Sequence, residues 1–309
     1  MLDRDPLLTR SKRRLGPLLN VPHINALRGV PMPDVTGDTA QCAIARMILE
    51  GGRLIGRVGE TEGRAVAFYL RNRMALSRAA LPYEPQNRHR LKLLAGFFPT
   101  TDASIDVLAR LYIEAIARID LYAAWTPHDR LLCPRRALVA RLHDLDPFFT
   151  VQRWTLALAG KRVTVVSPFK ATILAQWAKR DALFAVPTMP ECTLSVVAAP
   201  QTQCEQDVAG QDWFDNLHRL DAAVTATEPD VVIIGAGAYG LPIGAMAVAR
   251  RATAIVLGGP TQLLFGIMGN RWLIYPPYAA LQNSAWVRPR ADERPAGYHK
   301  LETAGGAYW

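Results

Sequence analysis

The stretch Val231-Val232-Ile233-Ile234-Gly235-Ala236-Gly237-Ala238-Tyr239-Gly240, followed by the apolar residues 241–249, decides the fold of this chain. The β-branched run predicts a strand, the glycines a tight turn and the small residues a helix. Gly235 and Gly237 permit unusual dihedral angles and a close approach to a ligand, and Gly240 lets the helix pack on the sheet. Free N–H groups at a helix start face anions, so we expect a phosphate-bearing ligand at this turn, with Tyr239 among its contacts.

The glycine spacing is that of the dinucleotide-binding fingerprint, but the acidic residue that holds the ribose is missing. After Asp230 no carboxylate occurs until Asp292, and the next predicted strand, 253–257, ends in Gly258-Gly259-Pro260-Thr261-Gln262. We therefore interpret the turn as a cradle for a phosphate or a nucleotide sugar in preference to an NAD site. The same spacing also occurs at strand–helix turns that merely pack closely.

Composition and charge narrow the class of protein. Of the 309 residues half are apolar and a fifth are charged, which is typical of a globular protein with a sizeable core. The net charge of +9 favours acidic partners such as phosphorylated substrates or anionic lipid headgroups. Nucleic acid is not expected, because the basic residues are scattered and form no recognised nucleic-acid module. The four cysteines and six histidines lack the spacing of a zinc site or a disulfide framework.

Two segments of the sequence indicate where in the cell the protein is located. Residues 1–35 are predicted to be a basic N-terminal extension outside the core, since Arg10 and residues 12–14 are basic and prolines at 6, 17, 22, 31 and 33 break any long helix. Such a segment can rest on the inner face of the plasma membrane or remain a solvated tail. The start of the chain lacks the order of a secretory signal peptide, and 231–249 contains four glycines and a proline, so a cytoplasmic protein without a membrane span is expected.

Residues 36–309 are predicted to form one α/β domain with a Rossmann-like parallel sheet and flanking helices, because strands and helices alternate. The expected strands are 54–58, 121–125, 162–166, 194–198, 231–234 and 253–257; the expected helices are 39–48, 63–78, 104–119, 170–179, 213–227 and 240–249. The segment 270–309, rich in proline and aromatic residues, is expected to wrap the surface.

Ligands of parallel sheets collect at the carboxyl ends of the strands, and two carboxylates follow the first strand there. Glu60 and Glu62 lie one residue apart between Gly59 and Gly63, so both can turn toward one hard cation, Mn²⁺ or Mg²⁺, that also binds substrate phosphates. Glu-x-Glu also arises by chance, and Glu62 could simply favour the N-terminus of the next helix.

Other candidates lie in later loops. Ser167 and the amides after it could bind phosphate at a helix start, with Lys170 adding charge; a lysine on a solvated first turn is the alternative. Arg271 follows a glycine-containing loop that could close on a diphosphate, and Gln262 belongs to the loop after strand 253–257. Asp102 is a possible base by residue type alone.

Parts of the sequence resemble a known protein family. Ile55-Gly56-Arg57-Val58-Gly59-Glu60-Thr61-Glu62-Gly63 resembles the R-x-G-D-x-E element of the GT-D class of bacterial glycosyltransferases. The Gly235–Gly240 turn, the stretch 258–266 and the closing residues 302–309 are similar to the C-terminal half of proteins with that fold. The resemblance implies a Rossmann-like GT-D architecture, a divalent cation held by the D-x-E element and a nucleotide-sugar donor.

Carried over by position, the resemblance implies that Glu60 replaces the family aspartate and that Glu62 matches its glutamate, while Arg57 and Gly59 match the flanks of the motif and support the donor. Glu60 is one methylene longer than aspartate, which puts direct metal binding in doubt. The resemblance further implies that a cation and nearby basic groups neutralise the diphosphate leaving group while a carboxylate deprotonates the acceptor hydroxyl.

These observations favour a cytoplasmic-side glycosyltransferase that moves a sugar from a nucleoside diphosphate sugar, with UDP favoured, to a glycan or lipid-linked acceptor in bacterial polysaccharide or glycoconjugate biosynthesis. An NAD(P)-dependent oxidoreductase is the first alternative; it is weakened by the missing ribose acid, and Arg250 and Arg251 could at most indicate a 2′-phosphate. A non-catalytic subunit that binds a nucleotide sugar is the second.

Overall fold

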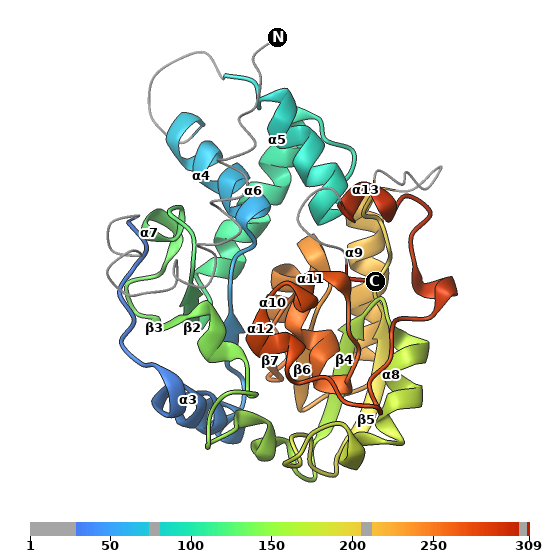
Figure 1. Ribbon diagram of the computed structural model, residues 1–309. Coiled ribbons are helices and arrows are strands. Elements are labelled where there is room, and N and C mark those ends of the chain that lie inside the picture. Colours follow the sequence, from blue (N-terminus) through green and yellow to red (C-terminus); the bar gives the residue numbers. More distant parts are fainter. Residues whose placement is uncertain (1–28, 74–80, 205–211, 303–307) are drawn as a thin grey trace.

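A seven-stranded sheet, parallel at every pairing, forms the centre of the protein (Figure 1). The computed structural model describes residues 29–73, 81–204, 212–302 and 308–309. The strand order is β3-β2-β1-β7-β6-β4-β5. The strands are β1 (Leu54–Gly56), β2 (Ile119–Ala124), β3 (Leu138–Arg141), β4 (Arg162–Ser167), β5 (Thr193–Ala198), β6 (Val231–Ile234) and β7 (Thr253–Val256). The predicted α/β class and Rossmann-like parallel sheet are confirmed.

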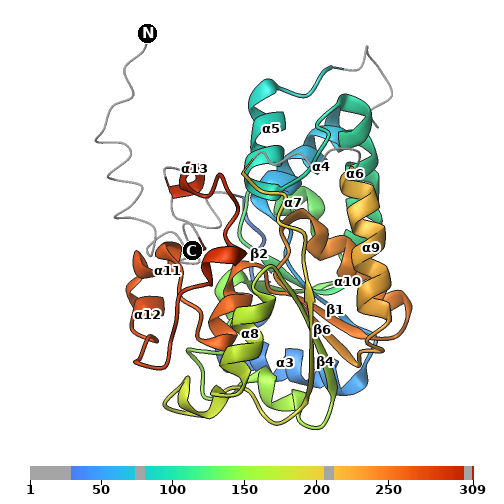
Figure 2. The same cartoon turned by 90° about the vertical axis from the view of Figure 1, so that its right-hand side faces the viewer.

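Helices cover both faces of the sheet. One face carries α4 (Glu60–Asn72), α6 (Asp102–Ile116), α9 (Trp213–Thr225) and α10 (Gly240–Ala249). The other carries α3 (Gly37–Glu50), α8 (Lys170–Trp177), α11 (Asn270–Leu273) and α12 (Pro276–Ala279). Figure 2 shows α9 on one side of the sheet and α11 and α12 on the other. The described residues also include the short helices α5 (Pro85–Arg90), α7 (Asp129–Leu132) and α13 (His299–Glu302).

The central strands β1, β7 and β6 are buried on both faces of the sheet. In β6, Val232 and Ile234 point into the core on the α10 side, whereas Val231 and Ile233 point into the core on the α8 side. A strand buried on both faces has a continuous apolar sequence, as in this run. Helix α10 approaches the sheet closely because a Cβ at Gly244 would lie only 3.0 Å from Leu54 Cδ1.

At two pairs of neighbouring strands, β1 with β7 and β6 with β4, the connections that leave the strands turn to opposite faces of the sheet. After β1 the chain enters α4 on one face, and after β7 it enters the 3-10 turn Gly259–Phe265 on the other. After β6 it enters α10, and after the adjacent β4 it enters α8 on the opposite face. Such divergence opens a crevice at the carboxyl ends of the strands, where ligands of α/β proteins bind.

Several boundaries and one segment differ from the sequence prediction. Strand β3 was not predicted, and helix α6 ends at Ile116, so that β2 begins at Ile119 rather than at residue 121. The segment 270–302 does not merely wrap the surface, because Trp272, Tyr278 and Trp286 are buried in the core on the α8 side. Most of the predicted basic extension, residues 1–28, lies outside the described residues. No helix in the described ranges is long and apolar enough to cross a membrane.

Candidate functional site

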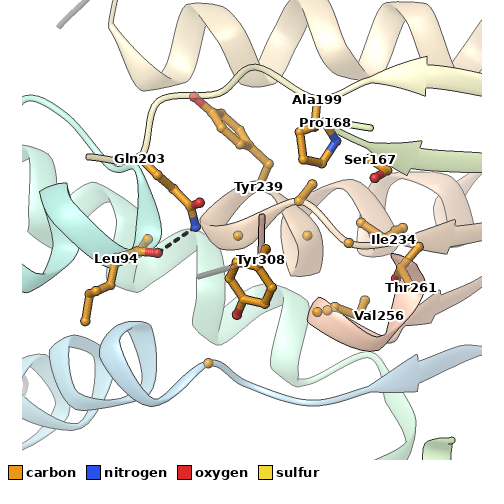
Figure 3. A pocket seen from close by; sticks show the side chains of 18 of the residues that line it. Leu94, Ser167, Pro168, Ala199, Gln203, Ile234, Tyr239, Val256, Thr261 and Tyr308 are labelled. Atoms are coloured by element: carbon orange, nitrogen blue, oxygen red, sulfur yellow. Dashed lines mark hydrogen bonds between the residues drawn. The ribbon is translucent and has the colours of Figure 1, made fainter. Parts of the chain in front are cut away.

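A pocket of about 440 Å³ lies over the carboxyl ends of β1, β7, β6, β4 and β5 (Figure 3). We call it the strand-end pocket. Its lining includes residues of the four predicted strand-end loops, 59–62, 167–170, 235–240 and 258–262, which lie up to about 200 residues apart in the chain. The predicted site residues that line it are Arg57, Gly59, Glu60, Glu62, Ser167, Gly235, Gly237, Tyr239, Gly240, Gln262 and Arg271. Lys170 and Asp102 are not among the lining residues.

The glycine turn after β6 is shaped by its neighbours in the protein. A Cβ on Gly235 would lie 2.7 Å from the Gly258 carbonyl oxygen and 2.7 Å from Thr261 Cβ, so glycine is needed where the loops after β6 and β7 meet. Gly237 has a φ of +53° and faces the Ala95 carbonyl. Tyr239 is buried, stacks on Trp213 with ring centroids 4.8 Å apart, and lies within 3.2 Å of the Thr202 hydroxyl. The turn therefore joins three loops around the pocket, and Tyr239 serves mainly as core.

Arg57 brings the first positive charge into the pocket. Its guanidinium carbon lies 5.4 Å from the centre of the Trp125 ring, and a Cβ on Gly258 would lie 2.2 Å from Arg57 Nη2. Gly258, at φ +72°, is thus needed both for its backbone conformation and for the space that it leaves to Arg57. In the described ranges no carboxylate lies within 4 Å of the Arg57 guanidinium, and the nearby Glu62 carboxylate feels its charge, which lowers the pKa of Glu62 against the larger effect of burial.

Arg271, at the start of α11, brings the second charge. It is half-buried, its Nη1 donates to the Tyr308 hydroxyl over 3.2 Å, and its guanidinium carbon lies 5.5 Å from the Tyr308 ring centre. Interaction with Tyr308 raises the pKa of Arg271, so this residue stays charged. Among the described residues it too lacks a carboxylate partner. Arg271 lines the strand-end pocket, and its binding of a diphosphate stays a prediction.

Glu60 and Glu62 lie in the first turn of α4 and differ in environment. The Glu60 carboxylate is paired with Arg64 at 2.9 Å and lies 3.8 Å from Arg90, and its side chain is about half exposed. The Glu62 carboxylate turns back over Gly59, where a Cβ would lie 2.2 Å from Glu62 Oε2, and is almost fully buried. Burial raises the pKa of Glu62. Acidic residues in a first helical turn are stabilised by the helix dipole, which accounts for both positions without a ligand.

The two glutamates do not form a ready cation site. One carboxylate is already neutralised by arginine, the other is folded against the backbone, and the described residues contain no cluster of three or more potential metal ligands. Mg²⁺ and Mn²⁺ need several oxygen ligands around them, so the side chains would have to rearrange before a metal could bind. Binding of Mn²⁺ or Mg²⁺ by Glu60 and Glu62 therefore stays a prediction.

The helix start after β4 is not a free phosphate site. The amides of Ala171 and Thr172 donate to Glu293 Oε1 over 2.7 and 3.2 Å, and the Phe169 amide donates to Ser167 Oγ. The carboxylate of Glu293 thus occupies the position that the sequence analysis assigns to a phosphate. Lys170 is exposed and does not line the pocket, so the alternative of a solvated lysine applies. Ser167 lines the pocket floor, but its hydroxyl caps the loop backbone.

Asp102 lies apart from the strand-end pocket. It is the first residue of α6, where its carboxylate accepts from Arg88 Nη2 over 2.6 Å and from the Tyr83 amide over 3.0 Å. These bonds tie the start of α6 to the loop before α5. Because Asp102 is paired and does not line the pocket, it is not placed to act as a base there.

The loop after β7 carries two buried oxygens without a partner in the described part of the chain. Thr261 Oγ1 and Gln262 Oε1 make no hydrogen bond, although both side chains are at least 98% buried. Gln262 Nε2 donates to the carbonyls of Ile267 and Tyr308, so its amide is oriented with the oxygen left over as an acceptor. Both residues line the pocket. Unpartnered buried oxygens are costly, and a ligand donor can satisfy them.

The pocket also contains residues that sequence reasoning missed. The loop after β5 supplies Gln201 and Gln203; the rule that places ligands at strand ends could have found them, because β5 was predicted. Trp125 follows β2 and was assigned to the strand itself. Tyr308 and Trp309 line the pocket through long-range packing that has no local sequence signal.

The oxidoreductase alternative would use Arg250 to hold the 2′-phosphate of NADP. Arg250 pairs with Asp221 of α9 just beyond the last residue of α10, and this ten-residue helix is about 15 Å long. It therefore lies at the opposite end of α10 from the glycine turn and is not placed to hold a 2′-phosphate there.

Comparisons of the chain with protein-family models, with curated proteins and with solved structures find no match.

Proposed function

We propose that the strand-end pocket binds the diphosphate of a nucleoside diphosphate sugar, with UDP favoured, and that the chain transfers the sugar to a hydroxyl of a glycan or lipid-linked acceptor. The observation that carries this proposal is the pair Arg57 and Arg271, two half-buried guanidiniums in one pocket, neither of which has a carboxylate within 4 Å in the described ranges. Charges withdrawn from water are normally paired, so an anionic ligand is expected between them. Arginine suits phosphate because its fork binds two oxygens at once.

The neutral groups of the pocket favour a ligand rich in hydrogen-bond donors. Gln262 Oε1 and Gln201 Oε1 have no donor among the described residues, and both amides are oriented because their nitrogens donate to carbonyls. Sugar hydroxyls and the N–H groups of a base are donors of this kind. The pocket volume of about 440 Å³ lies in the usual range for small-molecule sites.

The positions of the charged residues in the pocket wall suggest a role for each of them in sugar transfer. Arg57 and Arg271 would neutralise the charge that develops on the diphosphate as the bond to the sugar breaks. Glu62 is the better candidate for the base that takes the acceptor proton, because it is a buried carboxyl in the pocket wall and burial raises its pKa, which makes it a stronger base than an exposed carboxylate. Glu60 is paired with arginine and would support the loop. The GT-D architecture is the form of α/β fold that we propose for this chemistry.

The proposed setting is the cytoplasmic side of the plasma membrane, where lipid-linked acceptors are found. A basic segment such as residues 1–35 would be attracted to anionic headgroups. Binding of the full chain to vesicles with and without anionic lipid, compared with a chain that starts at residue 36, tests this setting.

The test of the proposed function is release of nucleoside diphosphate from a panel of nucleotide sugars. We expect slow release from one UDP-sugar with water as acceptor, and its loss in Glu62→Gln, while Arg46→Ala, at an exposed arginine of α3 outside the pocket lining, retains it. Binding of a UDP-sugar without release would instead support the non-catalytic subunit. Binding of NADPH but of no UDP-sugar would support the oxidoreductase.

The same assay tests the metal prediction. Release that needs Mn²⁺ or Mg²⁺, and whose metal dependence disappears in the Glu60→Ala, Glu62→Ala double variant, would show that the two glutamates rearrange to hold a cation. Release unaffected by a chelator would leave the two arginines as the groups that neutralise the diphosphate.

A further inference from the structure

The pair Tyr308–Trp309 is built into the wall of the strand-end pocket. A Cβ on Gly269 would lie 2.5 Å from the carbonyl carbon of Tyr308, and a Cβ on Gly259 would lie 2.7 Å from the Tyr308 ring. Two glycines thus leave room for the backbone and the side chain of one tyrosine. The Tyr308 carbonyl accepts from Gln262 Nε2 over 3.2 Å.

Trp309 fixes the pair from the other side. Its side chain is 4% exposed, its indole donates to the Glu293 carbonyl over 3.1 Å, and its own carbonyl accepts from Arg288 Nη1 over 3.2 Å. The Asn270 amide also points to this carbonyl, at 3.3 Å. Tyr308 is therefore held from both sides while its ring remains half-buried at the pocket (Figure 3).

The contact between Tyr308 and Arg271 joins a charged donor to a neutral acceptor. Arg271 Nη1 donates to the phenol oxygen over 3.2 Å, and the guanidinium also lies over the Tyr308 and Trp272 rings, at 5.5 and 5.8 Å from their centres. A hydrogen bond between an arginine and a phosphate oxygen joins two charges and is roughly twice as strong as one to a neutral group. A phosphate in the pocket would therefore compete well for the nitrogen that Tyr308 now occupies, while the aromatic rings could keep the guanidinium in place.

We propose that Tyr308 is a positioning residue for the diphosphate. Its ring holds the Arg271 guanidinium at the pocket face. When the ligand binds, the hydrogen bond from Arg271 to the Tyr308 hydroxyl breaks, and Arg271 donates to a phosphate oxygen instead. This inference rests on the proposed function, because it takes a diphosphate as the ligand. It assigns separate roles to the ring and the hydroxyl of one side chain, and these roles can be tested apart.

Calorimetric binding of inorganic pyrophosphate and of UDP to the full chain separates the two roles. Tyr308→Phe keeps the ring and removes the competing hydroxyl, so its affinity for both ligands should equal or exceed that of the wild type. Tyr308→Ala removes the ring as well and should bind both about tenfold more weakly, because Arg271 loses its support. Tyr69→Phe is the matched control, since it removes the hydroxyl of another arginine–tyrosine contact, Arg110 Nη1 to Tyr69 at 3.5 Å, outside the pocket lining.

The outcomes are distinguishable. Equal affinities for wild type, Tyr308→Phe and Tyr308→Ala would overturn the inference and leave the proposed function standing. An equal loss in Tyr308→Phe and Tyr308→Ala would also overturn it, because the hydroxyl itself would then bind the ligand. If Tyr308→Ala does not fold, Tyr308→Leu and the Phe variant decide between the same outcomes. Failure of the wild type to bind either ligand would remove the proposed function and, with it, this inference.

Discussion

The Arg57 guanidinium lies over the Trp125 ring, 5.4 Å from its centre, and Trp125 is in turn tied to the β1 loop because its indole donates to the Val58 carbonyl over 2.9 Å. An arginine in the pocket wall is thus held by an aromatic ring rather than by a carboxylate. This arrangement fixes its position and leaves its hydrogen-bond donors for a ligand.

The carboxylate of Asp129 organises the turn that carries Trp125. Its two oxygens accept from the amides of Trp125 and Thr126, both over 2.7 Å, and from the Tyr122 hydroxyl over 2.6 Å, and the side chain is fully buried. In Asp129→Asn an NH₂ group replaces one acceptor oxygen, so we expect the free energy of unfolding to fall by about 1–3 kcal/mol. Urea unfolding measures this. Asp181→Asn, at an exposed site, should change stability by less than about 0.5 kcal/mol, and equal effects would contradict the assigned role.

The glycine turn predicts a ranking of two alanine variants. In Gly235→Ala the new Cβ meets the Gly258 carbonyl and Thr261 at 2.7 Å, so we expect a loss of about 1–3 kcal/mol. In Gly240→Ala the nearest atoms are methyl groups at 3.3 and 3.6 Å, and alanine favours the helix, so the loss should be smaller. Thermal unfolding compares the two, and the reverse order would show that the loops after β6 and β7 do not meet as described.

Burial of Glu62 predicts a pH dependence of stability. Burial raises the pKa of Glu62 above its ordinary value of 4.5, so the folded protein holds this proton more tightly than the unfolded chain does. The stabilising contribution is then fully present below 4.5 and is lost as the pH rises through the folded-state pKa. Glu62→Gln cannot lose a proton, so its stability relative to the wild type should increase with pH above 4.5, by up to about 1.4 kcal/mol per pH unit, and then level off. Urea unfolding from pH 4 to 8 measures this difference, and a constant difference would contradict the burial effect.

The central parallel strands can be predicted from the sequence because the residues within each strand are enough to identify it. Val231–Ile234 is apolar on both faces, and a run of this kind bounded by glycines leaves little choice but a buried strand. The edge strand β3, Leu138–Arg141, was missed since it is only partly buried and four residues long. The rule that ligands bind at the carboxyl ends of strands identified most of the pocket residues, because the carboxyl ends of parallel strands all lie at one edge of the sheet.

The rest of the site depends on contacts between distant segments. The helix start after Ser167 has the local form of a phosphate site, yet its amides are taken by Glu293, 122 residues further along the chain from Ala171. Tyr308 reaches the pocket through the space left by Gly259 and Gly269, which no local pattern reveals. Asp102 was chosen by residue type, and its pairing with Arg88 could be seen only in the folded chain.

The most direct test is calorimetric binding of UDP and of NADPH to the wild type and to the Arg57→Ala, Arg271→Ala double variant, with Arg46→Ala, an exposed arginine outside the pocket lining, as the control. We expect the wild type and Arg46→Ala to bind UDP and the double variant to lose at least about a hundredfold in affinity, because two charge-assisted contacts are gone; NADPH should bind more weakly than UDP. UDP binding that is unchanged in the double variant, or NADPH binding that is tighter than UDP binding, would contradict the assignment of the strand-end pocket to a nucleoside diphosphate.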